Sequence, residues 1–155
     1  MNFNYIDKII SNCNSAKKAN PVDEFVLDLD DLSILDNINK NAIYIIVELD
    51  GNKDDTFEKL KEYKNKDERK CPKLNIASNI MYIGSSTTNL KKRIKEHMGE
   101  GHKSTYSLQL KHWFCGKYQI TVKLYDENKD VIQIIEDNLS NNLLPAFGKL
   151  GSNNK

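Results

Sequence analysis

The feature that most constrains the fold is the segment NAIYIIVELDG at residues 41–51. It is an almost continuous run of aliphatic, β-branched and aromatic residues, and it ends at Asp50-Gly51, a pair typical of turns. A strand with one face in water alternates apolar and polar residues, whereas a strand buried on both faces does not. We therefore predict a central strand at residues 42–49, with other parts of the chain packed on both of its faces.

Two more strands are predicted to join it. Residues 80–83 form a short apolar run that ends at Gly84, and residues 118–125 alternate apolar and polar side chains. Helical periodicity predicts further elements at residues 3–13, 55–64, 89–98, 105–114 and 130–142. The expected fold class is α+β, with a small three-stranded, antiparallel-type mixed sheet flanked by helices.

Length and composition are those of one globular domain, since 39% of the 155 residues are hydrophobic and 29% are charged. No apolar run approaches the roughly 20 residues that cross a bilayer, and residues 1–18 contain no signal-peptide core. Three cysteines without CxxC spacing argue against a disulfide framework. We expect a cytoplasmic protein. Its N-terminal extension (1–38) should pack on a domain (39–150) that carries a charged helical insertion (52–78), and residues 151–155 should form a flexible tail.

Positive charge is concentrated in one part of the chain. Residues 85–125 hold eight Lys and Arg residues against two Glu, and they also hold all three histidines. Such a segment on a near-neutral protein indicates a face that binds a polyanion, with a solvated lysine-rich surface as the alternative.

Two positions in predicted helices stand out. Arg93 and His97 are four residues apart, so their side chains project side by side from the helix at 89–98. That helix is expected to be capped by Ser86, Thr87 or Thr88 and to end at Gly99 and Gly101.

Glu136 lies beside the apolar stripe of the helix at 130–142, which is formed by Ile132, Ile135, Leu139 and Leu143. A carboxylate at such a place is costly unless it is paired or bound to a cation. An ion pair with a lysine or arginine is one explanation, and a metal site is the other.

Four motifs follow one another along the chain: AIY at 42–44, YIG at 82–84, R-x-x-x-H at 93–97 and Glu136 on a later helix. Together they resemble the GIY-YIG nuclease superfamily, which includes homing endonucleases, excision-repair nucleases and restriction enzymes. The resemblance covers residues 42–148. It implies a metal-dependent endonuclease that hydrolyses phosphodiester bonds in DNA, with restriction, phage defence, repair and mobile elements all open as its context.

The resemblance also implies site residues. The expected catalytic residues are Tyr44, Tyr82, Arg93, His97, His102 and Glu136. Arg93 would bind the scissile phosphate, and Glu136 would hold the single divalent ion, Mg²⁺ or alternatively Mn²⁺. Tyr44 would orient the water nucleophile and act as its base, with either His97 or a metal-bound hydroxide accepting the proton. His102 stands where some homing-type members have a further histidine.

Substrate contacts and partners follow from the same resemblance. The basic residues expected to flank the site as phosphate contacts are Lys91, Lys92, Lys95, Lys103 and Lys111. Double-stranded DNA is the expected partner, without a membrane. Specificity would come from the insertion, the N-terminal segment, a homodimer or a protein partner.

The chain departs from the family pattern at three places. Ala42 replaces the first glycine, and 37 residues separate Tyr44 from Tyr82 where a short hairpin is usual. Gly148 stands where a late asparagine is expected after a proline, with Asn153 or Asn154 as candidate replacements. A non-catalytic nucleic-acid-binding module on the same fold and a protein-interaction domain are therefore kept as alternatives.

Overall fold

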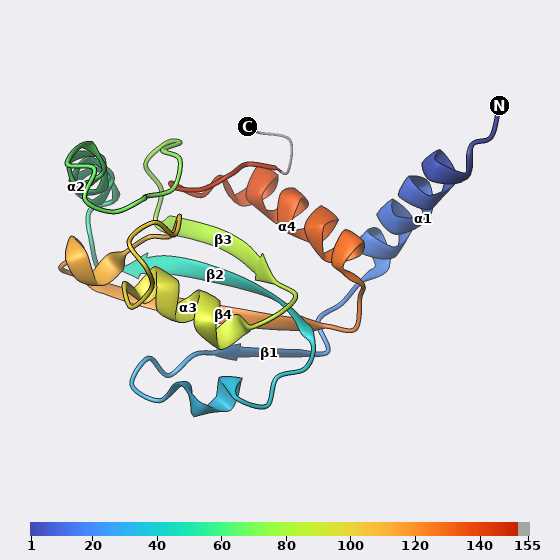
Figure 1. Cartoon of the computed structure of the whole chain (residues 1–155), viewed down its shortest axis with the longest axis horizontal. Coiled ribbons are helices and arrows are strands. Elements are labelled where there is room, and N and C mark those ends of the chain that lie inside the picture. Colours follow the sequence, from blue (N-terminus) through green and yellow to red (C-terminus); the bar gives the residue numbers. More distant parts are fainter. Residues whose placement is uncertain (152–155) are drawn as a thin grey trace.

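The computed structural model describes residues 1–151 (Figure 1). The elements, with η for a 3₁₀ helix, are α1 (Asn4–Lys18), β1 (Asp23–Val26), η1 (Leu32–Leu35), β2 (Asn41–Leu49), α2 (Lys53–Asn65), β3 (Ile80–Ser86), α3 (Leu90–Met98), η2 (Leu110–His112), β4 (Lys117–Tyr125) and α4 (Lys129–Leu143). Helices and an antiparallel sheet occur together, which confirms the predicted α+β class.

The sheet has four strands in the order β1-β4-β2-β3, and each neighbouring pair is antiparallel. The prediction of a three-stranded sheet is therefore wrong. The additional strand, β1, has only four residues, DEFV, which is too short for a clear period, and it pairs with β4 from Asp23↔Leu124 to Val26↔Thr121. The N-terminal extension thus contributes a strand to the sheet.

β2 lies between β4 and β3, and its residues Ala42, Ile43, Tyr44 and Ile46 are at most 1% exposed. Each face of the sheet has its own hydrophobic core. Tyr44 and Ile46 belong to the larger core, with residues of α2, α3 and η1, whereas Ile43 belongs to the smaller core, with residues of α4. Figure 1 shows α3 and α4 on different sides of the sheet.

The start of α3 differs from the prediction. β3 continues to Ser86, so Ser86, Thr87 and Thr88 precede the helix, and the cap is Asn89, whose side chain accepts the Lys92 N–H at 2.9 Å. Gly99 ends the helix as predicted, with a left-handed φ of 104° that suits glycine.

The predicted helix at 105–114 is wrong, because only the short η2 forms there. Gln109 has a φ of 55°, which interrupts helical geometry. The neighbouring polar groups bond elsewhere: the Ser107 hydroxyl donates to the Glu96 carbonyl at 2.9 Å, and the Trp113 indole donates to the Leu108 carbonyl at 2.6 Å. The apolar spacing that suggested a helix was that of Tyr106, Leu110, Trp113 and Phe114. Of these, Leu110 is buried, Trp113 and Phe114 are partly buried, and Tyr106 is 64% exposed.

The remaining helices are longer than predicted. α1 reaches Lys18, has no buried residue, and contacts the smaller core through Ala16 and Ala19. The insertion forms α2, which begins after Asn52, and an extended segment follows it. Leu143, predicted to be buried, is 38% exposed because α4 ends there.

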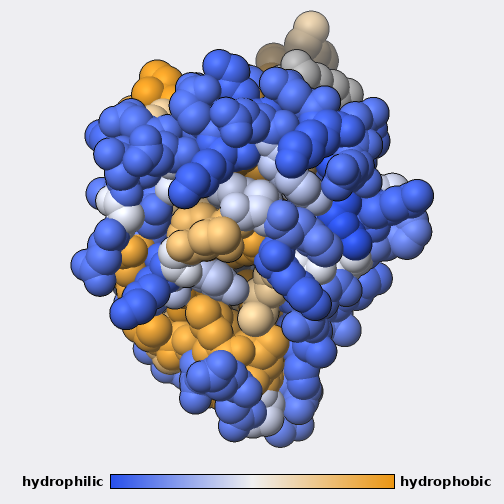
Figure 2. Space-filling view, turned by 90° about the vertical axis from the view of Figure 1, so that its left-hand side faces the viewer, coloured by the Kyte–Doolittle hydropathy of each residue, from blue (hydrophilic) through white to orange (hydrophobic). Residues whose placement is uncertain are grey.

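The surface is mostly polar, but apolar side chains are exposed near β1. Val26 and Ile34, from β1 and η1, are more than half exposed, and Figure 2 shows apolar side chains gathered in the lower part of one face. Within residues 1–151 no helix is long and apolar enough to cross a membrane, and Cys13, Cys71 and Cys115 are all free thiols.

Candidate active site

The site begins with a close approach between β2 and β3. Tyr44 lies opposite Gly84, so both face the side of the sheet that α3 covers. A Cβ on Gly84 would lie 2.4 Å from the Tyr44 hydroxyl oxygen and 2.8 Å from the Tyr82 ring. Glycine is therefore required at this position for the Tyr44 phenol to cross over β3 and lie beside Tyr82, with which it stacks at a centroid distance of 6.2 Å.

Arg93 of α3 joins both tyrosines. Its Nε donates to the Tyr44 hydroxyl oxygen at 3.2 Å, and its Nη2 donates to the Tyr82 hydroxyl oxygen at 3.3 Å and to the Tyr106 carbonyl at 3.1 Å. Nη1 forms an ion pair with Glu96 at 2.9 Å. The guanidinium fork has five N–H groups, so four of them are occupied within the described chain. Arg93 is thereby held in one orientation.

His97, one turn after Arg93, is fully buried. Its Nδ1 accepts the Leu108 backbone N–H at 3.2 Å, and its Nε2 lies 3.0 Å from the Tyr44 hydroxyl oxygen. Burial, followed by the nearby Arg93 charge, lowers the pKa of His97 well below its usual value, so the ring is neutral. A neutral ring that accepts at Nδ1 carries its proton on Nε2. We assign Nε2 as the donor to Tyr44 from this hydrogen-bond pattern.

The Tyr44 hydroxyl is enclosed. It accepts from both Arg93 and His97, and the residue is 1% exposed. Burial is the main cause that raises the pKa of Tyr44, followed by the neighbouring Tyr82, and the Arg93 charge opposes them. Tyr44 is thus a neutral phenol that holds Arg93 in place through the Nε hydrogen bond and does not itself line the cleft.

A cleft of about 730 Å³ lies beside β3, and Tyr82, Arg93 and Glu136 line it together. Glu136 reaches this cleft from α4, on the other side of the sheet, and the Ser85 hydroxyl donates to its carboxylate. Burial raises the pKa of Glu136, and the Ser85 hydrogen bond partly offsets the effect. Within residues 1–151 Glu136 has no ion pair, so the lysine or arginine partner considered above is not seen.

The cleft residues fit one type of metal site. Among the described residues no three His, Cys, Asp or Glu side chains are grouped as a metal cage. Mg²⁺ does not require one, because it keeps several waters and is held by one or two carboxylates together with substrate phosphate. Glu136, part-buried on the cleft wall close to Arg93, suits that arrangement.

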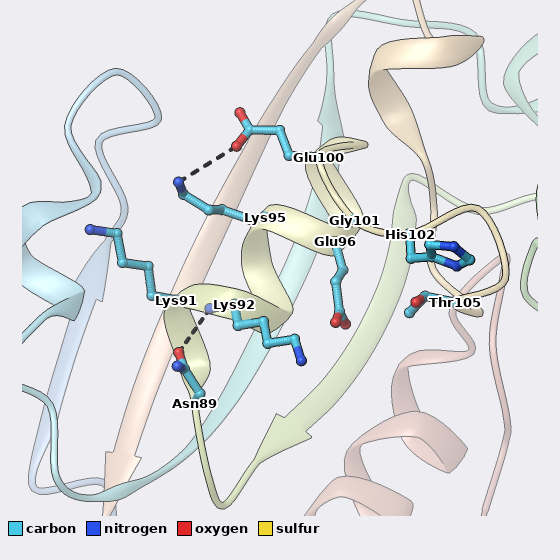
Figure 3. Close-up of a pocket in the computed structure, with 9 residues that line it drawn as sticks. All are labelled: Asn89, Lys91, Lys92, Lys95, Glu96, Glu100, Gly101, His102 and Thr105. Atoms are coloured by element: carbon cyan, nitrogen blue, oxygen red, sulfur yellow. Dashed lines mark hydrogen bonds and ion pairs between the residues drawn. The ribbon is translucent and has the colours of Figure 1, made fainter.

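His102 and the predicted lysines lie elsewhere. His102 is exposed, bonds to Ser104 and lines a separate pocket of about 490 Å³ with Lys91, Lys92 and Lys95 (Figure 3). In Figure 3 Lys91 and Lys95 point to one side of α3 and Lys92 points to the other, and Lys91 and Lys95 are paired with Asp36 and Glu100. Lys103 and Lys111 line neither space. The structure therefore does not bring His102 or these five lysines to the cleft that holds Tyr82, Arg93 and Glu136.

The cleft also contains residues that the sequence did not single out. The polar ones are Lys64, Lys73, Tyr106, Gln133 and Lys149, and Ser85 and Glu96 contact the cleft residues Glu136 and Arg93. Three of these side chains are cations that lie outside the basic segment 85–125. Lys64 and Lys73 belong to a charged insertion and Lys149 to the segment after α4, where a lysine has no distinctive pattern, so only spatial proximity identifies them.

Gly148 occupies the place of the late asparagine and closes the cleft. It has a φ of 102°, and a Cβ there would lie 2.8 Å from the Tyr82 ring. Glycine thus allows the segment after α4 to pack on Tyr82. Asn153 and Asn154, the candidate replacements, lie outside the described residues.

The comparisons with known proteins agree with this geometry. A family model of the GIY-YIG catalytic domain matches residues 73–145. No curated protein and no solved structure matches the chain. The matched segment contains Tyr82, Arg93, His97 and Glu136 but not β2 with Tyr44, which the sheet places between β3 and β4.

Proposed function

This chain belongs to the GIY-YIG nuclease superfamily through residues 73–145, and we propose that it is a metal-dependent endonuclease that hydrolyses phosphodiester bonds in DNA. One observation carries the proposal. A permanently charged guanidinium, a phenol and a part-buried carboxylate from three different elements line a single cleft, at Arg93, Tyr82 and Glu136.

Arg93 is suited to the scissile phosphate. Burial opposes its charge, but the two tyrosines and Glu96 outweigh that effect and raise the pKa of Arg93 above its usual value. Its planar donors match phosphate oxygens. Because Tyr44 and Tyr82 already fix the fork, it needs little reorganisation to stabilise the charge that develops in the transition state.

The assignment of the base changes. The assigned tautomer does not support a proton relay from Tyr44 to His97, because Nδ1 accepts from the Leu108 N–H and Nε2 is assigned the ring proton. Tyr82 is the phenol on the cleft wall, whereas Tyr44 lies behind Arg93. We propose that Tyr82 orients the attacking water and that Tyr44 and His97 act as positioning residues for Arg93.

Glu136 would hold the divalent ion, Mg²⁺ or Mn²⁺. Such an ion, when bound, would neutralise phosphate charge and lower the pKa of a coordinated water. The chain itself keeps the Glu136 carboxylate in place through the Ser85 hydroxyl, and Glu136 is the only acidic residue among the described residues that line the cleft.

Supercoiled plasmid cleavage in Mg²⁺ or Mn²⁺, with a chelator control, tests the proposal. The parent should nick or linearise the plasmid, and Glu136→Ala should not, although both should bind DNA in a gel shift. Arg93→Ala should lower kcat/KM by about two to three orders of magnitude and should weaken binding as well. Asp137→Ala is the matched control, because it removes the adjacent carboxylate, which accepts from Gln133 and does not line the cleft.

Each alternative has its own outcome in that experiment. A parent that binds DNA but never cleaves DNA or RNA with either ion is a non-catalytic nucleic-acid-binding module. A parent that does neither favours a protein-interaction domain. Equal cleavage by Glu136→Ala and the parent rules out Glu136 as the metal ligand.

A further inference from the structure

The insertion between β2 and β3 forms part of the cleft wall. We use the word strap for residues 69–75, the extended segment that follows α2. Cys71, Pro72 and Lys73 of the strap line the cleft together with Lys64 of α2, and the Lys64 ammonium donates to the Pro72 carbonyl at 2.8 Å. Cys71 and Pro72 are buried, so this wall is packed into the domain.

One end of the strap is fixed to the loop after α3. The Arg69 guanidinium donates to the Gly101 carbonyl and to the Gln109 side chain, both at 3.2 Å. The Lys70 backbone N–H donates to the Lys103 carbonyl at 2.8 Å. These bonds join the insertion to the segment whose Tyr106 carbonyl accepts from Arg93.

The other end is fixed to the segment after α4. Asn75 donates from its side chain to the carbonyls of Pro145 and Gly148, at 3.1 and 3.0 Å. Leu74 and Phe147 form an antiparallel bridge, and the Gly148 N–H donates to the Lys73 carbonyl at 2.8 Å. Lys73 and the residue after Gly148, Lys149, are thereby brought to neighbouring positions on two paired segments.

Both lysines are suited to bind an anion. Each is exposed, each lines the cleft, and neither has an ion pair within residues 1–151. By contrast, Lys91 and Lys95 on α3 are already paired with carboxylates. The Lys149 charge also acts on Glu136, where it helps to lower the pKa of the carboxyl group against the effect of burial.

We infer, on the basis of the proposed function, that Lys73 and Lys149 form a phosphate-binding rim that holds the cleaved strand next to the scissile phosphate. Arg93 and the rim then contact phosphates of the same strand, with Tyr82 between them on the cleft wall. In this arrangement the insertion helps to position the substrate strand, and the lysines of α3 are not the main phosphate contacts.

Binding of a labelled DNA duplex, measured in chelator over a range of salt concentrations, tests the rim. Each phosphate contact contributes about 0.9 to the slope of log affinity against log salt. The double variant Lys73→Ala/Lys149→Ala should therefore lower the slope by nearly two units, and Lys73→Arg/Lys149→Arg should restore it. The control Lys59→Ala/Lys117→Ala, which removes two charges from a separate pocket beside Glu48, should leave the slope unchanged.

The outcomes separate the rim from the proposed function. If the parent cleaves plasmid and the Lys73→Ala/Lys149→Ala variant keeps the parental slope, the rim is wrong and the nuclease assignment stands. If the slope falls but the parent never cleaves, the rim stands as a nucleic-acid contact and the catalytic proposal fails. A parent that binds no nucleic acid overturns both. The unfolding midpoints of all variants should equal that of the parent, because the substituted side chains are exposed.

Discussion

His97 donates a hydrogen bond to the Tyr44 hydroxyl across 3.0 Å and accepts none from it, because the other ring nitrogen of His97 accepts the Leu108 N–H. Two elements of the fold thus determine one tautomer. Tyr44 in turn receives N–H groups from both His97 and Arg93. The loop after α3 thus orients His97, His97 orients Tyr44, and Tyr44 orients the Arg93 guanidinium in the cleft.

The first prediction concerns this support. Tyr44→Phe removes the acceptor for two N–H groups and leaves the fully buried His97 donor unpaired. A buried donor without a hydrogen-bond partner destabilises the folded state by about 1–3 kcal/mol, so the free energy of unfolding should fall by that amount. Tyr82→Phe removes one acceptor at the cleft surface and should cost about 1 kcal/mol or less. Urea unfolding of the two variants measures the difference, and equal losses would contradict the enclosed role of Tyr44.

The second prediction concerns pH and His97. A histidine in the unfolded chain gains its proton near pH 6.5, but the buried ring has a lowered pKa and stays neutral. Below about pH 6.5 the unfolded state therefore binds more protons, and the parent should lose stability as the pH falls from 7 towards 5. His97→Gln should flatten this dependence, as urea titrations at several pH values would show.

Glu136 makes the opposite contribution to the pH dependence of stability. Burial raises its pKa, so the folded state takes up its proton at a higher pH than the unfolded chain, and this contribution increases stability as the pH falls. The pH comparison is therefore best made in a Glu136→Gln background, which removes this contribution. His102→Gln is the matched histidine control, since His102 is exposed. A pH dependence that survives His97→Gln but disappears in His102→Gln would refute the assignment to His97.

The strands were largely predictable, and so was the set of motifs. Ala42–Leu49 and Tyr118–Tyr125 have strong β patterns that the packing retains. β1 was missed because its pairing with β4 depends on partners far along the chain: Thr121 is 95 residues after Val26, and the partners of the other β1 residues are further away. The helix expected at 105–114 was wrong because Leu110 is buried from an irregular segment whereas Tyr106, at the same helical spacing, is exposed, so the spacing there does not indicate a helical face.

Within the candidate site, the residue identities came from the sequence but their arrangement did not. Motif order indicated Tyr82, Arg93 and Glu136, which the fold brings to one cleft. Charge density pointed to the lysines of α3, yet the density of charge along the chain does not say where each side chain points. In Figure 3 Lys92 points away from Lys91 and Lys95, although all three lie on one helix. Lys73 and Lys149 lie far apart in the chain, and the Leu74–Phe147 bridge, together with the hydrogen bonds of Asn75 and of the Gly148 N–H, aligns the segments that carry them.

The third prediction concerns Glu96, which is 14% exposed at its side chain and pairs with Arg93. Glu96→Gln keeps an acceptor for Nη1 but removes a negative charge beside the proposed phosphate site. DNA affinity in chelator should therefore rise severalfold, with a steeper salt dependence. Glu100→Gln removes a carboxylate that pairs with Lys95 outside the cleft, and it should have a smaller effect. Weaker binding in Glu96→Gln would mean that the full ion pair is needed to orient Arg93.

The last prediction concerns Gly148, which stands where the family resemblance leads one to expect an asparagine. Gly148→Asn introduces a Cβ 2.8 Å from the Tyr82 ring at a backbone φ of 102°. Strain of this kind costs about 1–3 kcal/mol, and the displaced ring would no longer meet Arg93 at the cleft wall. We expect a lower unfolding midpoint together with slower plasmid cleavage. Gly148→Ala, which has the same Cβ without the amide, should behave alike, whereas Lys149→Ala next to it should keep the midpoint. An asparagine variant as stable as the parent and faster in cleavage would instead mean that the Gly148 backbone adapts readily and that the amide contributes to catalysis.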